Sequence, residues 1–95
     1  MHKYYTTSKD CSISVCGNEY LCMHSKRALV FKLNETAMYI LSSLQDGAKS
    51  LGEIKNDIAE RYGLNDNEAE KVSLDVENIV DEFMRYGLVT VTELG

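Results

Sequence analysis

Three cysteines and one histidine gather near the start of the chain, and these residue types are the strongest metal ligands in the sequence. Cys11, Cys16, Cys22 and His24 could in principle supply the four ligands of a zinc or iron–sulfur site. Structural zinc sites usually contain a Cys-x-x-Cys pair, and these cysteines are spaced more widely. His24 would share a strand face with Cys16 and Cys22 only if no bulge intervened. We therefore expect buried, unreactive thiols, with no metal and no other cofactor.

Catalytic chemistry is not indicated by the remaining reactive side chains. A thiol nucleophile needs a base within reach, but His2 lies in a polar N-terminal segment and His24 lies in a short strand. Asp81 and Glu82 are neighbouring carboxylates of a kind that any acidic helix contains. The sequence has neither a glycine-rich phosphate loop nor a zinc-hydrolase motif. We therefore expect that the chain is not an enzyme.

The charge balance favours certain partners over others. The 95 residues include 10 basic and 15 acidic side chains, for a formal net charge of −5. This field repels nucleic acids and favours cationic or neutral partners. No signal-peptide pattern is visible, and no apolar run approaches the ~20 residues of a membrane span. We expect a cytoplasmic protein without membrane contact, with one domain over residues 10–95 and a flexible lead-in over residues 1–9.

The first part of the domain shows the period-two alternation of strands. The pattern predicts strands over residues 11–15, 20–23 and 28–33, of which the last has the strongest signal. The pair Gly17-Asn18 and the polar residues 25–27 supply the intervening turns. Three short strands joined by tight turns indicate an antiparallel meander.

The rest of the domain has helical periodicity. Asn34 is a suitable N-cap for a first helix, Ser50 with Glu53 has capping-box spacing for a second, and Asn65 or Asp66 can cap a third. The expected helix ends are Asp46-Gly47, Tyr62-Gly63 and Tyr86-Gly87. The third helix is the longest, and its core stripe is Ala69, Val72, Val76, Ile79, Val80 and Phe83.

The order of the elements predicts the fold class. Three strands followed by three helices indicate an α+β domain, winged-helix-like, with a three-stranded antiparallel sheet and helices packed on one side of it. Alternation resumes over residues 88–91 as a short tail. In this arrangement the wing of the winged helix comes first.

Several short motifs, in this order and spacing, resemble the PqqD-like family. They are Phe31-Lys32-Leu33-Asn34-Glu35-Thr36-Ala37, Asp46-Gly47, Ser50-Leu51-Gly52-Glu53-Ile54, and the late Asp75-Val76, Phe83 and Gly87-Leu88. The likeness covers about residues 12–89 and extends to the B proteins of lasso-peptide pathways. Together these domains are called RiPP recognition elements.

The resemblance implies a function in peptide recognition. Domains of this family bind the leader segment of a ribosomally synthesised precursor peptide and hold it for a modifying enzyme, often a radical-SAM enzyme, or for a leader peptidase. The leader adds as an extra strand to the edge of the third strand, in the groove between that strand and the third helix. The partners implied are therefore the precursor peptide and its maturase or peptidase.

The third strand provides the first group of candidate binding residues. Leu29, Phe31 and Leu33 share one face, which is most simply the core face, while Val30 and Lys32 share the other. The binding function would rest on the backbone groups of Val30, Phe31 and Lys32 if this strand lies at a sheet edge. Lys32, together with Arg27, either protects the edge or steers an acidic leader.

The third helix provides the second group. Leu74 and Asn78 lie off its core stripe, so they either line the peptide groove or are simply exposed. Asp75 occupies the position of the family's acidic residue and is either a ligand for a basic leader side chain or solvated. Asp81 extends the face of Leu74.

Two alternatives stay open at the level of the sequence. A small winged-helix DNA-binding regulator would have the same elements, but its recognition helix should carry Arg or Lys, whereas the third helix is acidic. An exposed strand edge could also pair two copies of the chain, so we expect a monomer or a weak dimer.

Overall fold

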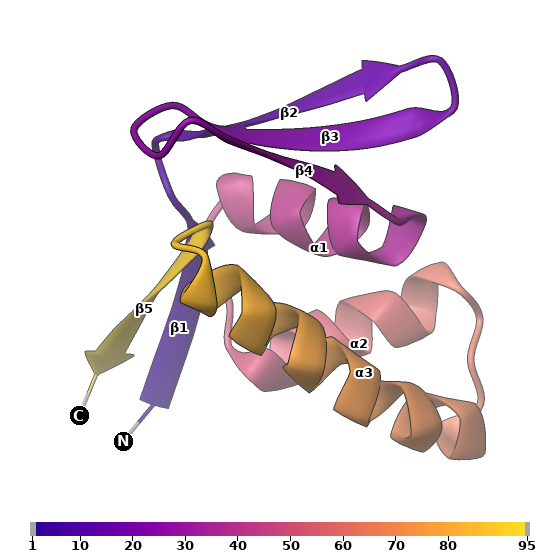
Figure 1. Ribbon diagram of the computed structural model, residues 1–95. Coiled ribbons are helices and arrows are strands. Elements are labelled where there is room, and N and C mark those ends of the chain that lie inside the picture. Colours follow the sequence, from indigo (N-terminus) through magenta and orange to yellow (C-terminus); the bar gives the residue numbers. More distant parts are fainter. Residues whose placement is uncertain (1, 95) are drawn as a thin grey trace.

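The computed structural model describes residues 2–94. In chain order its elements are β1 (His2–Thr7), β2 (Cys11–Cys16), β3 (Glu19–His24), β4 (Leu29–Leu33), α1 (Glu35–Gln45), α2 (Leu51–Arg61), α3 (Asp66–Arg85) and β5 (Val89–Leu94) (Figure 1). The predicted α+β class, with a three-stranded antiparallel sheet followed by three helices, is confirmed. A second sheet, made of β1 and β5, was not predicted. The likeness to a winged helix stays a prediction.

The three-stranded sheet has the order β2-β3-β4, so β3 is central and β4 is an edge strand. Gly17, at φ 61°, forms the turn between β2 and β3, and the register places Cys16 opposite Glu19. A Gly at this position supplies the positive φ that a two-residue hairpin turn needs. Ala28 enters β4 at φ 52°, an uncommon conformation for a residue with a Cβ.

The helices begin at the residues that the sequence predicts. The Asn34 side chain accepts a hydrogen bond from the Ala37 N–H at 2.7 Å. A reciprocal capping box between Ser50 and Glu53 opens α2. Asn65, not Asp66, caps α3, and its capping box with Glu68 satisfies two of the free N–H groups at the helix start.

The predicted flexible lead-in differs from the structure. Residues 2–7 form β1, which pairs antiparallel with β5 from His2↔Leu94 to Thr7↔Val89. The Thr7 hydroxyl donates to the Leu41 carbonyl at 2.7 Å, and the Thr6 hydroxyl donates to the Leu44 carbonyl at 3.1 Å. Hydrogen bonds from threonine hydroxyls therefore connect this polar segment to α1, so it needs no aliphatic stripe to be a strand. Met1 lies outside the described residues.

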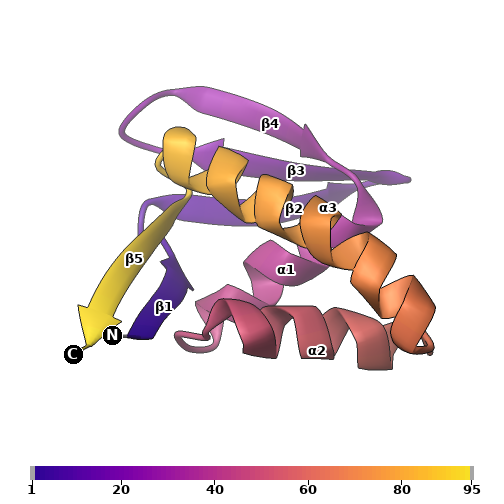
Figure 2. The same cartoon turned by 90° about the horizontal axis from the view of Figure 1, so that it is seen from below.

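The core lies between the three-stranded sheet and the helices. α1 runs beneath this sheet, and β1 and β5 lie together at one end of the molecule (Figure 1). Seen from below, α3 passes across the sheet, while α2 lies farther from it (Figure 2). The fully buried side chains come from β3, all three helices and the α3–β5 turn: Cys22, Ile40, Leu41, Leu44, Ile54, Ile58, Val76, Val80 and Leu88.

Candidate functional site

β4 presents unpaired backbone groups along one side. The Ser25 N–H donates to the Asp10 carbonyl at 2.9 Å, just beyond the ends of β2 and β3. Counting back from this pair, Met23 and Leu21 are the β3 residues whose backbone groups bond to β2. Because antiparallel strands alternate hydrogen-bonded and non-hydrogen-bonded pairs, β3 must direct its groups to Leu29, Phe31 and Leu33 in β4. The N–H and C=O groups of Val30 and Lys32 therefore point to the free edge.

A depression lies between this edge strand and α3. Its volume is about 190 Å³, below the roughly 300–1,000 Å³ of typical small-molecule sites. Phe31 and Tyr86 pack across it with ring centroids 4.9 Å apart. Its lining is mostly apolar: Phe31, Lys32, Leu33, Asn34, Ala37, Ile79, Glu82, Phe83, Tyr86 and Leu88. Its size and lining suit one or two apolar side chains of a peptide.

A second, more polar depression continues the first toward the N-terminal end of α3. It is lined by Asn34, Thr36, Val72, Asp75, Asn78 and Ile79. The two depressions share Asn34 and Ile79, so they adjoin, and we call them together the β4–α3 groove. β4 and α3 diverge toward this second depression (Figures 1 and 2). The groove is therefore narrow and apolar at the Tyr86 end and wider and polar at the Asp75 end.

The two walls of the groove differ in charge. Asp75 and Glu82 on α3 are exposed, and neither takes part in an ion pair among the residues that the structure describes. Lys32 is the cation of the β4 wall, and its Nζ lies 2.9 Å from a Glu19 carboxylate oxygen. The uncompensated charge of the groove lining is therefore negative.

The part of the chain that forms the groove matches the sequence model of a known protein family. Residues 19–89 match the model described as coenzyme PQQ synthesis protein D (PqqD). The chain belongs to the PqqD family. The matched range includes β3, β4, all three helices and the whole β4–α3 groove, and it confirms the resemblance predicted from the short motifs.

Two solved structures share the fold of this PqqD-family chain. One is "TbiB1 in Complex with the TbiA(beta) Leader Peptide", with a TM-score of 0.71, 20% identity, and coverage of 88% of this chain and 93% of that one. The other is "Lasso peptide synthetase B1 complexed with the leader peptide", with a TM-score of 0.70, 16% identity, and coverage of 90% and 96%. Comparison with curated proteins gave no significant match.

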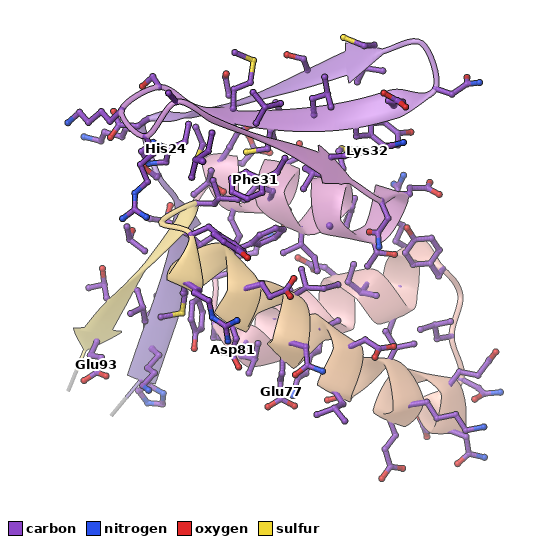
Figure 3. The ribbon with its side chains drawn as sticks, viewed as in Figure 1. His24, Phe31, Lys32, Glu77, Asp81 and Glu93 are labelled. Atoms are coloured by element: carbon purple, nitrogen blue, oxygen red, sulfur yellow. The ribbon has the colours of Figure 1, made fainter. Side chains whose placement is uncertain are left out.

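The β4 residues predicted for the site occupy different surroundings. Phe31, Lys32 and Leu33 line the β4–α3 groove, and Phe31 lies on the helix side of the sheet (Figure 3). Val30 lies on the outer face of the sheet and is 62% exposed. Leu29 belongs to the inner face but is exposed at the start of the strand, so the predicted core face is buried only in part.

The α3 residues predicted for the site separate into two groups. Asp75 and Asn78 line the groove. Leu74, which is 63% exposed, instead lines a separate shallow depression with Asn67, Glu70 and Lys71. Asp81 lies on the side of α3 that faces away from β4 (Figure 3). For all of these residues a binding role stays a prediction.

Sequence reasoning did not select several groove-lining residues of this PqqD-family domain. The sequence indicates Tyr86 only as a helix stop and Glu82 only as one of many acidic residues of the helix. Glu82 on α3 and Tyr86 at its C-cap follow Ile79 at the i+3 and i+7 positions, which share a helix face. Extending the stripe beyond its core members would have indicated them. Asn34 and Thr36 line the groove because α1 begins directly at the end of β4.

None of the three thiols lines the groove. Cys11 and Cys22 are buried as predicted, but Cys16 is exposed near the hairpin turn, so the prediction of buried thiols is wrong for Cys16. Burial raises the pKa of the Cys11 thiol, and burial together with the neighbouring Cys11 raises the pKa of Cys22 to about 12. Cys11 Sγ lies 3.6 Å from the Leu88 carbonyl oxygen, to which it donates. His24 Nδ1 accepts the Arg27 N–H at 3.2 Å. Among residues 2–94, no three metal-ligating side chains come together, and no helix is long and apolar enough to cross a membrane.

Proposed function

We propose that this PqqD-family chain binds the leader segment of a ribosomally synthesised precursor peptide by strand addition to β4. The observation that carries the proposal is the free edge of β4 beside the β4–α3 groove. Backbone hydrogen bonds to Val30 and Lys32 would supply affinity, and the groove would select side chains. Both structural neighbours are complexes with a leader peptide, which supports the same use of the fold here.

We further propose that the chain is a carrier rather than an enzyme and that it works in the cytoplasm. It would present the bound leader to a modifying enzyme of the radical-SAM type or to a leader peptidase. The raised thiol pKa values of Cys11 and Cys22 argue against thiol catalysis. The acidic character of α3 and the net charge of −5 argue against DNA as the partner.

The first test is an amide NMR titration of isotope-labelled protein with synthetic leader segments from precursor peptides encoded near its gene. We expect saturable shifts in β4 and in the groove face of α3, with a dissociation constant in the micromolar range or tighter. A scrambled leader of the same composition is the control. Shifts that are absent, or that are equal for the scrambled peptide, would refute leader recognition.

Presentation to an enzyme needs a separate test. Modification of the full precursor should be measured with the purified modifying enzyme, in the presence and absence of this chain. We expect the chain to accelerate modification at precursor concentrations below saturation. An unchanged rate, with the leader demonstrably bound to the chain, would refute presentation while leaving leader binding intact.

A further inference from the structure

The free charges of the β4–α3 groove lie on one wall. Asp75 and Glu82 both lie on α3, both line the groove, and both are exposed without an ion-pair partner among residues 2–94. On the opposite wall, Glu19 already neutralises Lys32. A peptide in the groove would therefore meet unopposed negative charge only along the α3 side.

The end of the groove beyond Tyr86 carries a positive charge, in contrast to the acidic α3 wall. Arg27 packs against Gly87, where an added Cβ would lie 3.0 Å from its Cζ atom. This position is just beyond Tyr86, which closes the apolar depression against Phe31. Basic side chains of a ligand are repelled from the Arg27 end and attracted toward Glu82 and Asp75.

The spacing of the two carboxylates matches an extended peptide. Asp75 and Glu82 are separated by about 10 Å along the helix axis, at about 1.5 Å per residue. An extended strand advances about 3.3 Å per residue, and its side chains face the same way at every second position. Two ligand side chains that are two or four positions apart would therefore have nearly the spacing of the two carboxylates. Long, flexible Lys or Arg side chains could make up the remaining difference.

We propose that the groove selects leader segments in which Lys or Arg side chains face Glu82 and Asp75 beside an apolar residue buried against Tyr86 and Phe83. This inference rests on the proposed leader binding and specifies its ligand: a cationic, apolar-anchored segment. β4 forms hydrogen bonds with the peptide backbone, and the apolar depression fixes the register of the peptide. The two carboxylates form ion pairs with its basic side chains.

The test is a selection from a randomised library of twelve-residue peptides displayed on phage, followed by sequencing of the bound fraction. The wild-type chain is compared with the double variant Asp75→Asn/Glu82→Gln. The matched control is Asp66→Asn/Glu70→Gln, which removes the same charge from α3 residues that line a separate depression beside α2. Circular dichroism verifies that all three proteins are folded.

We expect the wild type and the control to enrich Lys or Arg at two positions, two or four residues apart, next to an apolar residue. The double variant should lose this enrichment and should bind a selected peptide about tenfold more weakly. Each exposed ion pair contributes a factor of roughly two to five. The control should bind the same peptide within about twofold of the wild type.

The two possible failures are distinct. If the wild type selects no peptide at all, the proposed leader binding is refuted, and this inference with it. If the wild type selects peptides without basic enrichment, or if the double variant keeps that enrichment, only the charge selectivity is refuted. Equal weakening in the control would also overturn the assignment to Asp75 and Glu82.

Discussion

Proline substitutions along β4 should separate peptide binding from folding. The N–H groups of Val30 and Lys32 point to the free edge, so proline there removes no hydrogen bond of the β3–β4 ladder. The N–H of Phe31 points to β3, so proline at this position removes a ladder bond. We expect Val30→Pro to lose leader binding and keep its fold, and Phe31→Pro to lose stability.

The magnitude follows from the backbone contacts. Val30→Pro removes one donor to the leader, which contributes about 0.5–1.5 kcal/mol, and leaves a leader carbonyl buried without a partner at a cost of about 1–3 kcal/mol. The sum, about 1.5–4.5 kcal/mol, corresponds to a loss of affinity of roughly 10- to 2,000-fold. The stability of Val30→Pro should fall by less than about 1 kcal/mol, because the ladder is intact.

Fluorescence anisotropy with a labelled leader gives the affinities, and thermal unfolding followed by circular dichroism gives the stabilities. Val30→Ala is the matched control, because it shortens the same side chain and keeps the N–H. We expect this control to bind within about threefold of the wild type, since Val30 is on the outer face of the sheet. A folded Val30→Pro that binds like Val30→Ala would show that the leader does not add to β4.

Three further predictions concern the folded chain itself. In native protein at pH 8, iodoacetamide should modify only the exposed Cys16, because burial keeps Cys11 and Cys22 protonated; mass spectrometry showing more than one adduct before denaturation would contradict this. Asn34→Ala should cost about 1 kcal/mol through loss of the α1 cap and lower the melting temperature by about 4–8 °C, with an unchanged melting curve as the contrary result. Deletion of residues 1–7 should abolish cooperative unfolding, because β5 and the threonine contacts to α1 lose their partner; a truncated chain that melts like the full one would disprove this role of β1.

Local signals in the sequence predicted much of this fold. The period-two alternation around Gly17, the N-cap at Asn34 and the capping box at Ser50 each depend on residues a few positions apart. Interactions over so short a range can be recognised without knowing the tertiary structure. The edge position of β4 was open at the level of the sequence, and the strand order β2-β3-β4 of the folded sheet is what establishes it.

The missed features depend on contacts between distant parts of the chain. β1 has no apolar alternation of its own, since its threonines bond to α1 and its strand partner is β5. The polar depression exists only where α1 begins opposite α3, which brings Thr36 and Asp75 to one hollow. Neither arrangement has a signature within a short window of sequence, so only the folded structure could reveal it.

The pairing of β1 with β5 has a consequence for how the protein is made. A ribosome releases β1 first and β5 last, so β1 waits without its strand partner until synthesis of the domain ends. Closing such a distant pair is slow compared with forming the β2–β3 hairpin or α1. During synthesis the edge of β4 is also exposed before α3 follows. A nascent chain therefore displays two open strands, and the β4–α3 groove is completed only after both have had time to meet other chains.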